Sequence, residues 1–291
     1  MRNSLKKIAS SRTITAVCLP VLVILLSIML VLVVSDCGST QDESHLMDRA
    51  LIDTVAQPAP LVNAGAAVGS GAVLNAASLP FEVGAKLVFA ANSTGSPARV
   101  DFDLEGPWDL TRGPSALTLT MAPVDKSDAP HADRFPDATM VVRSSWKPAL
   151  VEDKYIFQDL DAESWLSYGN AGADRLVVFS QPSHALIFPA AVGDRWVDIY
   201  QQTEDGRVTD IRAENRIVAY NTLEVPAGRF DAFLLQTRVT ATSDNDSVST
   251  WDYVWLVPGI GRAAEIVSLP GEKDEVFGKA FSVYRLQDYN A

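Results

Sequence analysis

The stretch Phe233-Leu234-Leu235-Gln236-Thr237-Arg238-Val239-Thr240-Ala241-Thr242 decides the fold class of this chain. Counting from Phe233, every second residue is Phe, Leu, Thr, Val or Ala, whereas the residues between them include Gln, Arg and two Thr. Successive side chains of a strand point to opposite faces, so a period of two indicates a half-buried β-strand. The stretch therefore predicts a strand with one face toward a core and the other toward solvent.

The same period of two recurs along the chain from residue 79 onward. It is present in 117–121 and 251–255, and turn residues such as Glu204-Asp205-Gly206 separate the segments. Only Asp161–Tyr168 offers a candidate for a short helix. Alternating segments split by turns are typical of an antiparallel sheet with one buried face. A sheet of about a dozen strands curls or closes, so we predict a mainly β fold, a curved antiparallel sheet forming a half-barrel, barrel or sandwich.

An N-terminal transmembrane helix is expected to precede this sheet. Four basic residues in 2–12 are followed by an uncharged run from Thr13 to Ser35. A run of about 20 apolar residues spans a bilayer core, and the basic residues place the N-terminus in the cytoplasm. Residues 1–36 are therefore interpreted as a membrane anchor, with the rest of the chain extracytoplasmic.

A second interpretation of the same segment is a lipoprotein signal. Val34-Ser35-Asp36-Cys37 resembles the lipobox of bacterial lipoproteins, in which the cysteine is acylated after cleavage. Asp36 departs from the small residue of that pattern. Cys37 is thus a candidate lipidation site, and both interpretations place the protein at the cell membrane, single-pass or lipid-anchored.

Composition divides the remaining chain into a linker and one β domain. Of the 25 residues from Ala56 to Pro80, 16 are Ala, Gly, Pro or Ser, which is typical of a flexible spacer. We assign residues 37–78 to a flexible linker with a short helix near residues 46–55, and residues 79–291 to the extracytoplasmic domain.

The β domain contains an internal echo that suggests two similar halves, 79–185 and 186–291. Residues 79–89 align with residues 188–198, and in both copies Pro stands four residues before Gly. A Pro- and Gly-shaped turn that begins a strand explains the echo. The halves are expected to form either one continuous sheet or two lobes.

Three turns in the second half resemble the TapB-type family of exported bacterial envelope proteins. They are Val192-Gly193-Asp194-Arg195-Trp196, Val225-Pro226-Ala227-Gly228-Arg229-Phe230 and Pro258-Gly259-Ile260-Gly261, within residues 186–270. The resemblance implies a curved antiparallel β fold at the cell envelope. It supplies no catalytic residues.

Charge restricts the partners of the domain. The chain has 24 basic and 36 acidic residues, and four of the basic ones lie in the anchor. A strongly acidic domain repels nucleic acid and anionic lipid headgroups. We therefore expect an envelope ligand or protein partner, contact with the membrane only through the N-terminal segment, and no cofactor.

The sequence offers no catalytic residue and no metal site. Ser183-His184 lacks a Gly-x-Ser-x-Gly turn, and no His or Cys pair has the spacing of metal ligands. Residues 101–106 imitate the start of a calcium loop, but Arg112 stands where its bidentate Glu is required. These observations favour a protein that is not an enzyme.

The aromatic stripe Trp251, Tyr253 and Trp255 is the candidate binding site. Rings on one face of a strand either line an apolar or sugar-binding pocket or fill the core. The function most consistent with these features is non-catalytic binding of an apolar or polymeric ligand, or of a protein partner. The alternatives are a structural or assembly component of a surface complex and an extracytoplasmic carbohydrate hydrolase.

Overall fold

A computed structural model describes residues 71–92, 96–149, 152–244 and 246–290 of the protein. The expected anchor (1–36), Cys37 and most of the expected linker lie outside these residues. Within the described ranges, no helix has the length and apolar character needed to cross a membrane.

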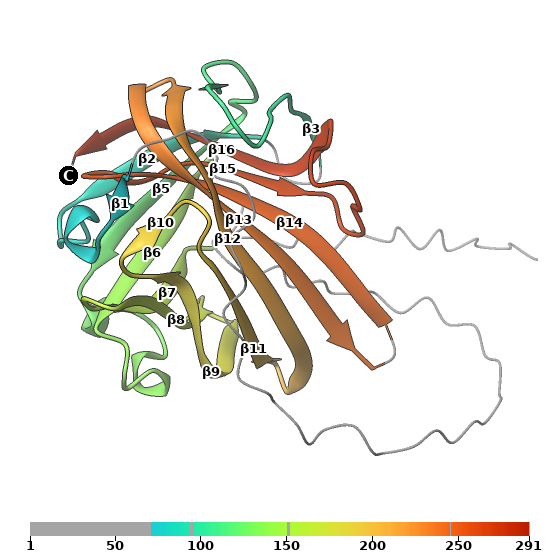
Figure 1. Ribbon diagram of the computed structural model, residues 1–291. Coiled ribbons are helices and arrows are strands. Elements are labelled where there is room, and N and C mark those ends of the chain that lie inside the picture. The colour runs from blue at the N-terminus through green and yellow to red at the C-terminus, as the bar shows by residue number, and fades with distance from the viewer. Residues whose placement is uncertain (1–70, 93–95, 150–151, 245, 291) are drawn as a thin grey trace, which may run out of the picture.

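Twelve antiparallel strands form a closed barrel, which is one of the predicted forms (Figure 1). Around the barrel the order is β11-β9-β8-β7-β6-β5-β2-β16-β15-β14-β13-β12, and β12 pairs with β11 to complete it. Strands of both sequence halves lie in this one sheet. The barrel strands are β2 (Lys86–Ala91), β5 (Leu117–Val124), β6 (Met140–Lys147), β7 (Lys154–Leu160), β8 (Ser164–Ala171), β9 (Leu176–Ile187), β11 (Arg195–Glu204), β12 (Arg207–Val225), β13 (Gly228–Ser243), β14 (Asp246–Val257), β15 (Gly261–Ser268) and β16 (Lys279–Asn290).

Short elements lie beside the barrel. They are the two-residue strands β1 (Val73–Leu74), β3 (Ala98–Arg99), β4 (Trp108–Asp109) and β10 (Ala190–Ala191), and the 3-10 helices η1 (Ala76–Ser78), η2 (Lys126–Asp128) and η3 (Ala132–Arg134). β1 pairs with β10. Part of the stretch that the sequence analysis assigned to the linker therefore packs on the barrel.

The Gly-containing turns have the backbone geometry expected of them. Gly84 and Gly193, the equivalent glycines of the internal echo, have φ of 104° and 100°. Val225 pairs with Gly228 across the β12–β13 turn. In the β14–β15 turn, the Gly259 amide donates to the Ser78 carbonyl at 2.6 Å. These turns require glycine because L-residues rarely adopt such positive φ values.

One expected element differs in the structure. Residues 161–168 form a turn and the start of β8 instead of a short helix. The Asp161 carboxylate accepts hydrogen bonds from the amides of Glu163 and Ser164 at 2.8 and 2.7 Å. Such local side-chain bonds stabilise a turn in competition with a helix.

The inner face of the barrel is identified by register and burial. In β11, Asp198 and Tyr200 are buried whereas Val197 and Ile199 are exposed. Residues directly opposite in an antiparallel ladder share a face. Following the paired residues from strand to strand therefore identifies the inner-facing side chains of the whole barrel. Its buried polar side chains form a belt, made of Ser144, Gln158, Ser167, Ser183, Asp198, Gln202, Asn215, Thr237, Asp252, Arg262, Glu265 and Ser282.

One end of the barrel, called here the upper end, carries the β14–β15 turn. The chain preceding β2 lies across this end, with Leu74 and Leu79 buried in an apolar cluster that includes Trp165, Leu186 and Leu235. Apolar contact between the segment and the barrel wall stabilises this covering. The polar belt lies on the inner wall together with this apolar cluster.

Candidate ligand-binding hollow

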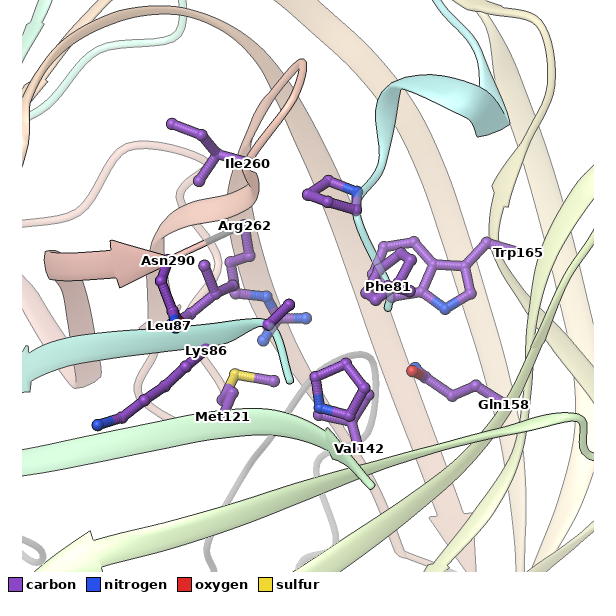
Figure 2. Close-up of a pocket in the computed structure, with 13 residues that line it drawn as sticks. Phe81, Lys86, Leu87, Met121, Val142, Gln158, Trp165, Ile260, Arg262 and Asn290 are labelled. Atoms are coloured by element: carbon purple, nitrogen blue, oxygen red, sulfur yellow. The ribbon is translucent and has the colours of Figure 1, made fainter. Parts of the chain in front are cut away.

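A small hollow with a cavity volume of about 30 Å³, partly open to solvent, lies at the upper end of the barrel (Figure 2). Strands from both halves of the chain supply its walls. The residues that line it include Phe81, Met121, Val142, Gln158, Trp165 and Arg262.

Apolar side chains form most of the surface of the hollow. Met121 lies on β5 and Val142 on β6, and their strands pair so that both residues face inward. Phe81, from the segment before β2, packs on Trp165 of β8 with ring centroids 4.8 Å apart at 54°. A tilted aromatic pair of this kind is a favourable contact beyond its buried area. The segment before β2 thus forms one wall of the hollow.

Three polar atoms at the same hollow have no hydrogen-bond partner among the described residues. They are Gln158 Oε1, Trp165 Nε1 and Arg262 Nε, on residues that are 3%, 6% and 5% exposed. In Figure 2 the three side chains extend into the hollow from different strands. A buried polar group without a partner costs about 1–3 kcal/mol. Two donors and one acceptor therefore lie without partners in the wall of the hollow.

Arg262 is held by an ion pair on the inner face of the barrel. Its Nη1 contacts the carboxylate of Glu265, three residues later in β15, and both side chains are buried. This pair fixes the guanidinium at the wall of the hollow. A buried arginine paired in this way is a geometrically defined donor.

The aromatic stripe lies on the outer face of the sheet and does not line the hollow. Trp251, Tyr253 and Trp255 are 8%, 0% and 0% exposed, because the loops around Phe102 and Phe277 cover them. Phe102 lies 5.0 Å from the Tyr253 ring, and Trp108 lies 5.8 Å from the Trp255 ring. The rings pack in the core, and a ligand-binding role for them stays a prediction.

His184 has a carboxylate partner but no catalytic arrangement among the described residues. Its Nδ1 lies 2.8 Å from Asp198 Oδ1, and its backbone amide donates to Oδ2. The hydrogen bond to Asp198 raises the pKa of His184. The neighbouring Ser183 is fully buried and has no hydrogen bond to His184 among the described residues. The contact instead bridges β9 and β11 where they have no ladder pairing.

The calcium-like stretch is a loop in the structure. Residues 100–107 contain no strand, and the Asp103 carboxylate accepts hydrogen bonds from the amides of Glu105 and Gly106 at 2.9 and 2.6 Å. Phe102 of this loop packs on the aromatic stripe. No group of three metal-ligating side chains occurs in the described part of the chain.

Comparisons with known proteins find similarity in structure only. A protein described as exported and as having a YmcC-like fold, from Bacteroides fragilis NCTC 9343, is 12% identical with a TM-score of 0.46, covering 73% of this chain and 98% of that one. A protein described as a lipoprotein, from Parabacteroides distasonis ATCC 8503, is 10% identical with a TM-score of 0.39, covering 73% and 97%. Similarity at this level assigns neither a location nor an activity.

The sequence comparisons add no family. No family model matches the chain, and the search of curated proteins finds no match. The resemblance to the TapB-type family is therefore not confirmed.

Sequence reasoning missed the hollow. Gln158 and Trp165 lie in the consecutive strands β7 and β8, but Arg262 lies in β15, far from both in sequence, and nothing in the spacing links the three residues. One local signal was present, since Arg262 directly follows the Pro-Gly-x-Gly turn. A charged residue there reads as solvent-exposed until the pairing of β15 is known.

Proposed function

We propose that the protein is a non-catalytic binding protein that holds an apolar small molecule bearing at least one polar group in the hollow at the upper end of its barrel. The observation that carries this proposal is that a mostly apolar hollow is lined by three residues whose atoms Gln158 Oε1, Trp165 Nε1 and Arg262 Nε are buried without a hydrogen-bond partner among the described residues. Apolar walls with a few fixed polar groups are typical of ligand sites.

The proposal explains two features together. The apolar walls favour burial of a hydrocarbon or ring by about 25 cal/mol per Å² removed from water. The three buried polar atoms then gain partners, and a wholly apolar molecule would leave them without any. The ligand class is therefore amphipathic.

We also propose that this barrel is tethered to the membrane and faces away from the cytoplasm. Support comes from the basic residues before the uncharged run 13–35 and from the lipobox-like segment ending at Cys37. Protease added to intact cells should degrade the barrel and spare the N-terminus. Recovery of the intact protein from the cytosol would contradict the tether.

A filling substitution tests the binding function. Val142→Phe places a ring in the hollow, whereas Val197→Phe adds the same ring on the exposed outer face of β11. Binding of the neutral apolar dye Nile red to the full-length protein is measured by its fluorescence. We expect Val142→Phe to weaken binding about tenfold or more and Val197→Phe to leave it unchanged.

A second variant that fills the hollow distinguishes blocked binding from misfolding. Ala85 also lines the hollow but lies in the segment before β2 and is only half-buried. Ala85→Phe should weaken dye binding in the same way. Dye binding that is equal in the wild type and in both filling variants, with circular dichroism unchanged, would overturn the proposed function.

A further inference from the structure

A lysine on the inner wall lies beside the hollow. Lys154 begins β7 and pairs directly with Ser144 of β6, which pairs directly with Met121 of β5. Directly paired residues share a face of the sheet, so all three face the interior. Met121 lines the hollow, and two strand spacings, about 10 Å, separate its backbone from that of Lys154.

The Lys154 side chain has no hydrogen bond or ion pair within the part of the chain that the structure describes. The two carboxylates with an electrostatic influence on it, Glu204 and Glu265, each form an ion pair with an arginine, Arg175 and Arg262 respectively. Lys154 is half-buried, and an ammonium on the inner wall without a counter-ion attracts an anion. The Lys154 ammonium therefore has no counter-ion of its own, and a bound anion would stabilise its charge.

Ser144 supplies a donor at the same place. Its side chain is fully buried, and its Oγ has no hydrogen-bond partner among the described residues. Burial, followed by repulsion from Arg175, lowers the pKa of Lys154 to about 7. An anion bound next to Lys154 would favour its charged form and return the pKa toward the ordinary value.

We propose that the ligand of the hollow is an amphipathic anion, an apolar chain ending in a carboxylate, whose charged group is bound by Lys154 and Ser144. This inference rests on the proposed function and names the class of its ligand. The apolar chain contacts Met121 and Val142, and it extends toward the Phe81–Trp165 pair. Arg262 Nε provides a further donor on the facing wall.

Two probes that differ only in charge test the inference. Equilibrium dialysis of full-length protein measures the affinity for decanoate and for 1-decanol, in the wild type and in Lys154→Met. We expect Lys154→Met to weaken decanoate binding about tenfold or more, since a hydrogen bond to a charged group contributes about 1.5–3 kcal/mol. Affinity for 1-decanol should stay within about twofold of the wild type.

Two further variants act as controls. Lys147→Met removes an exposed lysine at the end of the neighbouring strand β6 and should change neither affinity. Lys154→Arg keeps the positive charge and should preserve the preference for decanoate, which also covers the case in which Lys154→Met fails to fold.

The outcomes separate the two proposals. If Lys154→Met and Lys154→Arg both leave decanoate binding unchanged, or weaken decanoate and decanol equally, the anion site is overturned and the hollow remains a binding site. If the wild type binds neither probe, both proposals fail.

Discussion

Phe81 and Trp165 join the segment before β2 to the barrel wall, with ring centroids 4.8 Å apart. The contact brings together residues 84 positions apart in the sequence numbering, one in a connecting segment and the other in β8. Because both rings also line the hollow, this pair couples the covering of the upper end to the shape of the candidate site.

Removing the Phe81 ring should loosen the covering of the hollow. We expect Phe81→Ala to lower the free energy of unfolding by about 1–2 kcal/mol, since the ring is only half-buried. Dissociation of Nile red should become faster, as measured by stopped-flow fluorescence. Phe230→Ala removes a half-buried ring that contacts Tyr289 and not the hollow, and should leave the dissociation rate unchanged. Equal rates in both variants would show that Phe81 does not cover the site.

The aromatic stripe should be essential for stability. Trp255 is fully buried between Trp108 and Phe102, so Trp255→Ala should cost about 3–5 kcal/mol. Trp251→Ala should have a cost of the same order. Denaturant melts measure both, with the half-buried Trp196→Ala as the control. Nearly unchanged midpoints for Trp251→Ala and Trp255→Ala would contradict the core role.

Lys154 should make the free energy of unfolding rise with pH above neutrality. Its folded pKa of about 7 is below the ordinary value of 10.5, so between these values the unfolded chain binds more protons and stability increases with pH. Lys154→Met should remove this part of the dependence between about pH 7 and 9.5. Urea melts across that range provide the test, and equal slopes in wild type and variant would contradict the lowered pKa of Lys154.

His184 should have the opposite effect and make the free energy of unfolding fall as pH rises. Its pKa is raised in the folded state by Asp198, so the stabilisation is complete below the unfolded value of about 6.5 and is lost as pH rises through the folded pKa. His184→Gln should flatten this fall in urea melts, whereas His131→Gln should not. A His184 proton titration that is unaffected by Asp198→Asn would refute the pairing.

Cys37 provides a separate test of the tether. If the lipobox-like segment is processed, a fatty-acid analogue fed to cells should label the protein, and Cys37→Ser should abolish the label. Unlabelled protein that still partitions with membranes would favour the uncleaved helix of residues 1–36.

Alternation along single strands allowed the sheet to be predicted, because side-chain direction is a local property of β-structure. The stretch 233–242 lies wholly within β13, and the turn before Gly228 is where it was expected. The sequence pattern limited the sheet to a half-barrel, a barrel or a sandwich, but it did not predict that the barrel closes. It depends on the pairing of β11 with both β9 and β12, and the sequence carries no signal for the first of these contacts.

The hollow was not predictable for a different physical reason. A bulge between Trp255 and Leu256 shifts the β14–β15 register, so Arg262 pairs with Leu256 and turns inward. Such a bulge breaks the period of two that sequence reasoning relies on. The covering of the stripe by Phe102 and Phe277 likewise comes from loops, whose positions a strand pattern does not contain.

The most direct test of ligand binding in the hollow is a proton–nitrogen NMR titration of the tryptophan indole groups with 1-decanol. We expect the Trp165 indole signal to shift and saturate, because Trp165 lines the hollow and its Nε1 has no partner among the described residues. The Trp251 and Trp255 signals, on the outer face under Phe102 and Phe277, should stay in place. A saturating shift of Trp251 or Trp255 with Trp165 unmoved, or no saturable shift of any indole, would contradict it.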